Sequence, residues 1–403
     1  MTKPELPALL FGGSPISALG FARSLARNGV TVYYVTDNKN EATFSRYLKE
    51  CYVIPNIETD VKMQIDFLNK FQKMHPFSVV FPGSDIFCLN LACAKVKLEN
   101  KVREGFHFLL APEEIVETLA NKRKFYHSIS NCGIAHPPTY FSESLDDATR
   151  IGRELEYPVF VKPSISQVFA KVFGVKGFVA KSREELIKYY DLAMRHGIDV
   201  LIQEIIPGPN NQVFGINAYF DKKNNPRGLF VYRRIRGWPH VFGYGSLIES
   251  IPLSSMPEAN TVVHYLHELG YHGLVDAEFK MDERDGNFKF LEVNPRVWVQ
   301  NSFPTKCGIN LDLMAYLDAI DNQAVHEGRY KNGIRWADSL SDFQSVIKML
   351  SDGEISVSEW ISSLHMIKDW AYSPLDDLVP WILDPLFRLR KYVQKKMPQN
   401  RTH

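Results

Sequence analysis

Residues 272–296, HGLVDAEFKMDERDGNFKFLEVNPR, decide the fold of this chain. Apolar and polar residues alternate over residues 275–281 and again over residues 288–293, and residues 282–287 between them are charged or small. This alternation is typical of strands with one buried face, and the charged segment is typical of a turn. The stretch therefore predicts a β-hairpin.

Acidic and amide side chains fall on defined faces of this hairpin. Successive side chains of a strand point to opposite faces, so Asp276 and Glu278 share one face, and Glu292 and Asn294 share a face of the returning strand. If the strands pair around the turn, Glu278 lies opposite Glu292, with Asn294 one step further along.

Such a group of oxygen atoms is suited to a metal. Two carboxylates and an amide are the hard ligands that Mg²⁺ favours when it also bridges nucleotide phosphates. The alternative is a surface hairpin with solvated acids. Glu292 stands between Leu291 and Val293. Burying a carboxylate on an apolar strand costs roughly several kcal/mol unless the carboxylate has a partner. We therefore favour a metal site at Glu278, Glu292 and Asn294.

Length and composition indicate a soluble globular protein of two or three domains. The chain has 403 residues, of which 45% are hydrophobic and 23% charged, and its 47 Lys and Arg nearly balance 46 Asp and Glu. This balance gives no indication of nucleic-acid binding. The five cysteines form no CxxC pair, and neither a signal peptide nor a transmembrane run is visible, so we expect a cytoplasmic protein.

The first hundred residues predict a parallel sheet. Residues 8–37 show the pattern strand, Gly-Gly-Ser turn, amphipathic helix and strand, which is a βαβ unit, and residues 78–85 and 107–111 add strands. The glycines lack the spacing of a dinucleotide fingerprint, which favours a tight turn over nucleotide binding there. Asp85 follows a strand and either faces a substrate or caps the next helix.

Two lysines stand out in the next segment. Residues 113–132 are expected to be helical and contain Lys122. Lys162 ends the apolar strand at residues 157–163, where it meets an anion or extends along apolar surface into water. Residues 164–173 predict a flexible connection.

A strand at residues 200–206 is closed by Pro207 and Gly208. Gln203 and Glu204 supply acceptors there, and Ile206 supplies the last backbone N–H before proline, an alternation suited to the edge of adenine. An ordinary strand and turn is the alternative.

Residues 213–221 and 227–236 predict a second hairpin. Arg234 and Arg236 are expected to share a face of its second strand, and two guanidinium groups on one face indicate phosphate or carboxylate recognition. Near the C-terminus a predicted helix carries basic residues without any acid nearby. It suits either an anionic membrane surface or an acidic partner, although a solvated helix is the favoured interpretation. These residues are Arg388, Arg390, Lys391, Lys395 and Lys396.

Taken in order, these elements resemble the ATP-grasp superfamily and its carboxylate–amine ligase branch over roughly residues 5–325. Four stretches carry the resemblance: FVKP at 160–163, IQEIIPG at 202–208, VDAEFK at 275–280 and LEVNPR at 291–296. Each is weak alone, and their order makes them specific.

The resemblance implies a role for each candidate residue. Lys122 and Lys162 would contact the phosphates of ATP, and Glu278, Glu292 and Asn294 would bind Mg²⁺, for which Mn²⁺ is the alternative ion. Arg296, aided by Arg234 or Arg236, would stabilise the acyl phosphate and the tetrahedral intermediate. The base would be held by Gln203, Glu204 and the Ile206 backbone, and Asn211 would replace the usual acidic residue at the ribose.

The fold class expected is α/β and α+β. A Rossmann-like parallel-sheet domain at residues 1–112 would precede a two-lobed ATP-grasp domain, with its small lobe at 113–199 and its large lobe at 200–327. A mostly helical C-terminal extension would follow at residues 328–403.

The function expected is an ADP-forming ligase that joins a small carboxylate to an amine, with homodimerisation as a further expectation. One alternative is an ATP-grasp enzyme with another acceptor, a small-molecule kinase or carboxylase. Another is a catalytically silent ATP-binding protein. The amide residues at 210–212, after Pro207 and Gly208, favour this alternative, whereas the acidic pair Glu278 and Glu292 argues against it.

Overall fold

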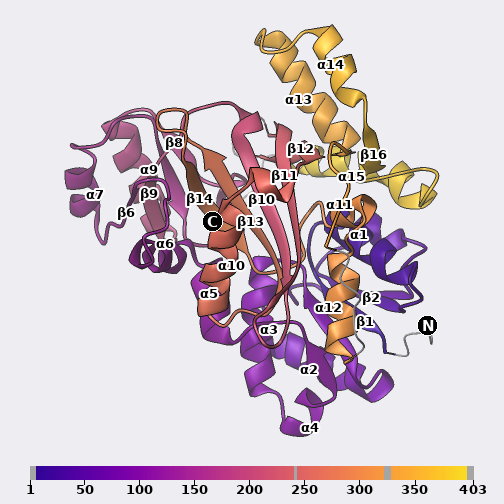
Figure 1. The fold of residues 1–403 in the computed structure, drawn as a ribbon. Helices are drawn as coiled ribbons and strands as arrows, with labels where there is room; N and C mark the ends of the chain where they lie inside the picture. The colour runs from indigo at the N-terminus through magenta and orange to yellow at the C-terminus, as the bar shows by residue number, and fades with distance from the viewer. Residues whose placement is uncertain (1–5, 240–242, 322–327, 397–403) are drawn as a thin grey trace.

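The computed structural model describes residues 6–239, 243–321 and 328–396, and the side chains of Lys395 and Lys396 lie outside the described part. Three β-sheets organise these described residues, as Figure 1 shows. The N-terminal sheet is parallel, and the other two are antiparallel apart from one pair of strands. The predicted combination of α/β and α+β structure is confirmed.

The N-terminal sheet has the strand order β3-β2-β1-β4-β5. Its strands are β1 (Ala8–Phe11), β2 (Val32–Thr36), β3 (Glu50–Val53), β4 (Ser78–Pro82) and β5 (Phe106–Phe108). Its helices are α1 (Pro15–Ala26), α2 (Val61–Met74), α3 (Asp85–Lys97) and α4 (Asn100–Arg103). Both faces of β1 are buried, with Leu9 and Leu10 in different core clusters, as expected for a parallel strand covered on two sides.

The smaller antiparallel sheet has the order β6-β9-β7-β8. Its strands are β6 (Thr139–Tyr140), β7 (Val159–Pro163), β8 (Phe178–Ala180) and β9 (Val200–Glu204). The nearby helices are α5 (Glu113–Ala120), α6 (Lys122–Asn131), α7 (Leu145–Ile151), α8 (Ser166–Phe173) and α9 (Arg183–Arg195). The expected lobe boundary at residues 199/200 assigns β9 to the large lobe, whereas its hydrogen bonds join it to β6 and β7.

Two local predictions in this lobe are wrong. The helix expected over residues 113–132 is broken at Asn121, whose side chain accepts a hydrogen bond from the Lys124 N–H and so starts a second helix. The flexible connection expected at 164–173 is largely helix α8, in which buried Phe169 packs against Phe173 and Phe178.

The larger sheet has the order β14-β13-β10-β11-β12-β15-β16. Its strands are β10 (Val213–Phe220), β11 (Pro226–Trp238), β12 (Tyr244–Ser250), β13 (Gly273–Met281), β14 (Phe288–Asn294), β15 (Arg335–Ala337) and β16 (Ile367–Trp370). The helices α10 (Glu258–Glu268), α11 (Ser302–Cys307) and α12 (Leu311–Ala319) accompany it. The predicted hairpin of residues 272–296 is confirmed as β13 and β14.

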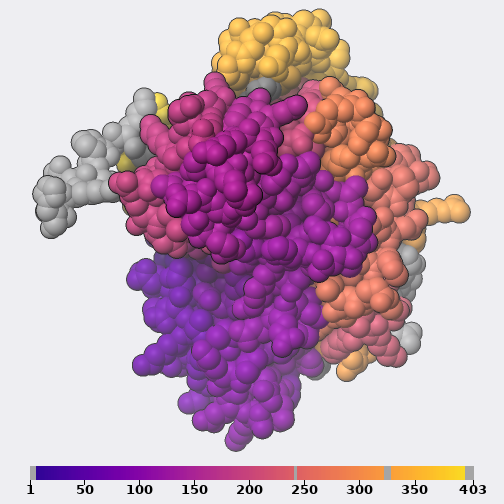
Figure 2. All heavy atoms as spheres, turned by 90° about the vertical axis from the view of Figure 1, so that its left-hand side faces the viewer, coloured from indigo at the N-terminus to yellow at the C-terminus, as the bar shows by residue number. Residues whose placement is uncertain are grey.

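The C-terminal segment is mostly helical, as expected, but it also extends this sheet. Its helices are α13 (Ser339–Ser351), α14 (Val357–Leu364) and α15 (Leu378–Lys396). Strands β15 and β16 join the sheet edge beside β12. Figures 1 and 2 show α13 and α14 standing out from the body of the molecule as a helical pair.

Candidate active site

A cavity of about 800 Å³ lies where the two antiparallel sheets meet. Strands β7 and β9 of the small sheet face β11, β13 and β14 of the large sheet across it. Most of the predicted site residues line this cavity. They are Lys122, Lys162, Gln203, Glu204, Ile206, Asn211, Arg234, Glu278 and Glu292.

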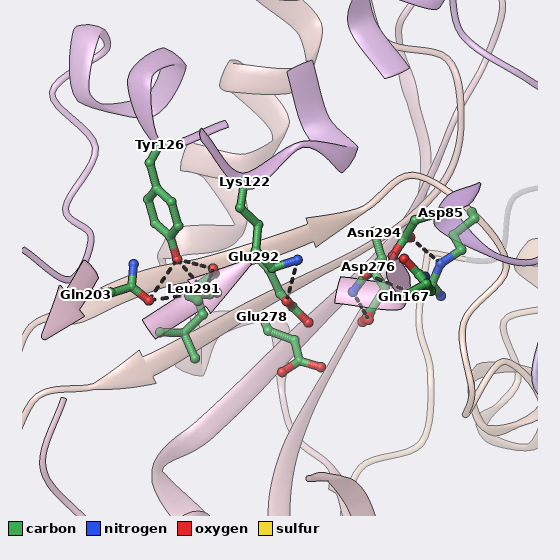
Figure 3. A network of polar contacts seen from close by, with 12 residues as sticks. Asp85, Lys122, Tyr126, Gln167, Gln203, Asp276, Glu278, Leu291, Glu292 and Asn294 are labelled. Atoms are coloured by element: carbon green, nitrogen blue, oxygen red, sulfur yellow. Dashed lines mark hydrogen bonds and ion pairs between the residues drawn. The ribbon is translucent and has the colours of Figure 1, made fainter. Parts of the chain in front are cut away.

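The acidic pair lies on the hairpin as its alternation predicts. Glu278 and Glu292 are direct partners in the register of β13 and β14, and both line the cavity. Lys122 lies 3.6 Å from Glu292, and the Arg234 guanidinium donates to Glu278 over 3.2 Å. Figure 3 shows the two carboxylates side by side beneath the end of Lys122.

The two carboxylates differ in their electrostatic surroundings. Burial and the neighbouring charge of Glu292 raise the pKa of Glu278, against the influence of Arg234. Burial also acts to raise the pKa of Glu292, but Lys122, Lys162 and Lys176 outweigh it and lower that pKa. Glu292 therefore stays ionised, and the pair presents negative charge to a cation.

Lys162 is a buried residue of the cavity lining. Its ammonium group donates to the Tyr126 hydroxyl over 2.9 Å, to the Gln203 side-chain oxygen over 3.2 Å and to the Leu291 carbonyl over 3.3 Å. Burial lowers the pKa of Lys162 to about 8, although Glu292 and Glu278 oppose this shift. Lys162 is thus fixed in position and still mostly protonated at pH 7, which suits a group that binds an anion.

Gln203 and Glu204 at the end of β9, which were expected to supply acceptors for adenine, make contacts within the protein. The Gln203 amide bridges Lys162 and Thr139, to which it donates over 2.8 Å. The Glu204 backbone N–H donates to the Pro138 carbonyl, and its carboxylate pairs with Arg284 at 2.5 Å. Ile206 and Asn211 also line the cavity, and their roles at the base and the ribose stay predictions.

Asn294 and Arg296 form a second polar cluster beside the cavity rather than in its lining. Arg296 donates to Asp85 over 2.5 Å and to the Asn294 oxygen over 3.0 Å, while Asn294 donates to Asp276 over 3.2 Å. Burial and Glu278 raise the pKa of Asp276, against the influence of Arg296. Figure 3 shows this cluster adjoining the acidic pair. Asp85 was expected either to face a substrate or to cap the next helix. Ser84 caps α3 instead, and Asp85 accepts a hydrogen bond from Arg296.

The prediction that Arg236 shares a face with Arg234 is wrong. An irregularity in β11 leaves Ile235 unpaired, so Arg234 lies opposite Ile248 while Arg236 lies opposite Leu247. Adjacent residues of β12 point to opposite faces, and the two arginines therefore do so too. Arg236 is buried against Asp342 of α13, with hydrogen bonds of 2.7 and 2.8 Å, and is removed from the cavity.

Sequence analysis missed three further residues of the site. Tyr126 orients Lys162, Lys176 lines the cavity in the loop before β8, and Lys280 donates to the Gly208 carbonyl over 2.8 Å. The alternation that places Asp276 and Glu278 on one face of the strand also places Lys280 there, although Lys280 was not among the predicted site residues. Tyr126 and Lys176 carry no local signal.

The residues present fit a divalent cation that also contacts phosphates. Within the described residues no cluster of three or more His, Cys, Asp or Glu could hold a metal by itself. Mg²⁺ commonly binds through one or two carboxylates together with substrate phosphates and water. Two facing carboxylates in a lysine-lined cavity match that mode, with Glu278 and Glu292 as the direct ligands and Asn294 next to them on β14.

Comparison with known proteins found similar chains but no matching family model. D-aspartate ligase of Enterococcus faecium is 25% identical over 344 residues, which cover 81% of this chain and 79% of that protein. The small subunit of 2-oxoglutarate carboxylase of Hydrogenobacter thermophilus is 25% identical over 291 residues, and this chain spans 57% of its length.

Solved structures show the same fold. The biotin carboxylase domain of the H. thermophilus 2-oxoglutarate carboxylase, crystallised with MgADP and bicarbonate, gives a TM-score of 0.62 at 18% identity. The match covers 81% of this chain and 73% of that one. The chain shares the fold of these structures, with a parallel N-terminal sheet and two antiparallel sheets enclosing a lysine- and carboxylate-lined cavity, and the predicted resemblance to the ATP-grasp superfamily is confirmed.

Proposed function

We propose that this protein is an ATP- and Mg²⁺-dependent ligase that joins a carboxylate to an amine and releases ADP and phosphate. The observation that carries the proposal is the pair Glu278 and Glu292, opposed on one hairpin inside a cavity that also contains Lys122 and Lys162. The similarity to D-aspartate ligase supports carboxylate–amine ligation as the reaction.

The chemistry accounts for this set of residues. A carboxylate is a poor acyl donor because its leaving group would be oxide. When its oxygen attacks the γ-phosphorus of ATP, ADP leaves and an acyl phosphate forms. This transfer depends on positioning and charge neutralisation, not on a protein nucleophile. Lys122 and Lys162 would bind the phosphates from one side of the cavity.

A divalent ion bound at Glu278, Glu292 and Asn294 would neutralise charge on the phosphates during transfer, with Mn²⁺ as an alternative to Mg²⁺. The low pKa of Glu292 keeps this ligand ionised at neutral pH. Arg234 and Lys122 hold the two carboxylates in position when they are not engaged by the ion.

In the second step the amine nitrogen attacks the acyl carbon, phosphate leaves, and the nitrogen loses a proton. Arg234 lines the cavity and would neutralise the developing oxyanion. Arg296 would contribute from the adjoining cluster, where Asp85 and Asn294 fix its orientation. Adenine would rest against Ile206 and Gln203, and Asn211 would contact the ribose.

A carboxylase is the second candidate. The similarity to the 2-oxoglutarate carboxylase small subunit favours it, because bicarbonate would replace the organic acid in the same activation step. Homodimerisation is proposed as well, since the related biotin carboxylase domain is described as a dimer.

The test is ADP release with Mg-ATP and panels of amines and carboxylic acids, bicarbonate included, comparing wild type with Glu292→Ala. We expect ADP formation that requires both an acid and an amine and disappears in the variant. ADP formation with bicarbonate alone among the acids would favour the carboxylase. Calorimetric ATP binding without turnover on any panel would contradict both candidates and favour a silent ATP-binding protein.

A further inference from the structure

Helix α15 is attached to the protein by its polar side. Arg388 pairs with Asp384 one turn earlier at 2.5 Å and with Asp338 before α13 at 2.8 Å, and it donates to the Ser341 hydroxyl over 2.7 Å. Asp384 and Pro380 are buried on this side. The sequence-based expectation that the basic residues of this helix have no acid nearby is therefore wrong for Arg388.

The opposite side of α15 is apolar and faces outward. Five large side chains spaced by three or four residues form a stripe along the helix, and Trp381 lies exposed beside it. Each of the five is at least 41% exposed. This apolar stripe consists of Leu378, Ile382, Leu386, Leu389 and Val393. Surface helices of globular proteins normally turn their apolar side toward the core. Helix α15 turns its apolar side outward, which indicates an apolar contact outside the chain.

The exposed charged side chains beside the C-terminal half of the stripe are basic. Arg390 and Lys391 are exposed at its C-terminal half. Every charged side chain after Asp384 in the sequence is basic, from Arg388 to Arg401. A partner that covers the stripe must therefore tolerate or neutralise positive charge.

We propose that α15 lies on an anionic lipid surface, with the apolar stripe in the headgroup region and Arg390 and Lys391 against lipid phosphates. Apolar and basic residues on one exposed helical surface, with tryptophan at the edge, are the pattern of interfacial helices. No helix in the described part of the chain is long and apolar enough to cross a membrane.

A second copy of the chain fits this surface less well. In a twofold-symmetric contact the same patch of each protomer would face the other, bringing two sets of basic residues to one interface. Anionic lipid supplies the opposite charge and an apolar layer together. This inference does not depend on the proposed ligase reaction, because α15 contributes no residue to the lining of the cavity.

Flotation of the full chain with vesicles tests the proposal. We compare vesicles of phosphatidylcholine with vesicles that also contain phosphatidylglycerol, and expect at least about tenfold more binding to the latter. Replacing Arg390 and Lys391 by glutamine should weaken binding roughly fivefold for each charge. Leu386→Asp with Leu389→Asp should abolish binding, while the matched pair Met74→Asp and Val96→Asp, equally exposed on α2 and α3, should not alter it.

Circular dichroism and thermal unfolding establish that each variant is folded, and light scattering gives its mass. Equal binding to both vesicle types, or binding unaffected by the leucine pair, would overturn the proposal. A dimer in solution that the leucine pair converts to monomer would also overturn it, because a second copy would then cover the apolar stripe.

Discussion

At the residue scale, the two carboxylates of the cavity differ in pKa because different charged side chains lie near each of them. Glu278 and Glu292 occupy equivalent positions on paired strands, yet the pKa of one is raised and that of the other lowered. Three lysines surround Glu292, whereas Glu278 faces Arg234 and the charge of its partner. Glu292 is therefore the stronger candidate for a permanently ionised metal ligand.

Glu292→Gln keeps the shape of this side chain and removes its charge. We expect turnover to fall at least about 100-fold, since charge neutralisation at transferring phosphates is a large contribution to catalysis. ADP release under saturating substrates measures this loss. Glu283→Gln, an exposed acid in the turn of the same hairpin, is the control and should retain full activity. Equal activities of the two variants would remove Glu292 from the mechanism.

Lys162 predicts a pH dependence of ATP binding. Its pKa is lowered to about 8, so the folded protein loses this positive charge as pH rises through that value. At pH 9 about a tenth of free molecules would keep the proton, so ATP should bind about tenfold more weakly than at pH 7. Calorimetry at the two pH values measures this difference. Lys162→Arg keeps its charge and should show a much smaller change, and an equal decline in both proteins would assign the effect to another group.

At the element scale, a single unpaired residue in β11 separates two arginines that the sequence suggests are equivalent. Ile235 shifts the register, so Arg234 enters the cavity and Arg236 turns toward α13. Strand alternation alone places them on one face, because the pattern of residue types carries no sign of the irregularity. Arg236 thereby becomes a buried link between the large sheet and the C-terminal helices.

Arg236→Met should lower the free energy of unfolding by about 3–5 kcal/mol, because it leaves the buried charge of Asp342 unpaired. Urea denaturation measures the loss. Arg233→Met, which breaks a partly exposed pair with Glu249, is the control and should cost about 1 kcal/mol or less. The affinity of the folded Arg236→Met protein for ATP should be unchanged, and a selective loss of ATP binding would restore Arg236 to the site.

At the scale of the whole molecule, buried polar contacts join the N-terminal domain to the large lobe. Asn301 donates to the Ser17 carbonyl of α1 and to Asp312 of α12, each over 3.2 Å. Burial raises the pKa of Asp312 to about 8, against the influence of Asn301. Among the described residues its second carboxylate oxygen has no hydrogen-bond partner, which agrees with a neutral acid at this junction.

Asp312 should make the protein less stable as pH rises. The folded state binds this proton more tightly than the unfolded state does, so its contribution is lost progressively from the ordinary carboxyl pKa up to about 8. Asp312→Asn should therefore be more stable than wild type at pH 8 by about 1 kcal/mol or more, with a smaller difference at pH 5. Urea denaturation at both pH values measures this, with exposed Asp66→Asn as the control. A difference independent of pH would contradict the assignment.

Local sequence patterns were sufficient to predict the elements that carry the site. Alternation identified β13 and β14 and placed Glu278 opposite Glu292, because register follows from a short turn between two strands. The βαβ pattern likewise predicted the parallel N-terminal sheet. The order of short motifs along the chain indicated the superfamily, although no one of them was sufficient alone.

The tertiary structure decided which side chains meet across elements distant in sequence. Only the fold brings Tyr126 to Lys162 and Asp85 to Arg296, and only the fold buries Arg236 against α13. It also decided that α15 is attached through Asp384 and Arg388 and directs its apolar side outward. A sequence specifies which faces of an element are polar or apolar, but the charges and cavities that those faces meet depend on packing between elements.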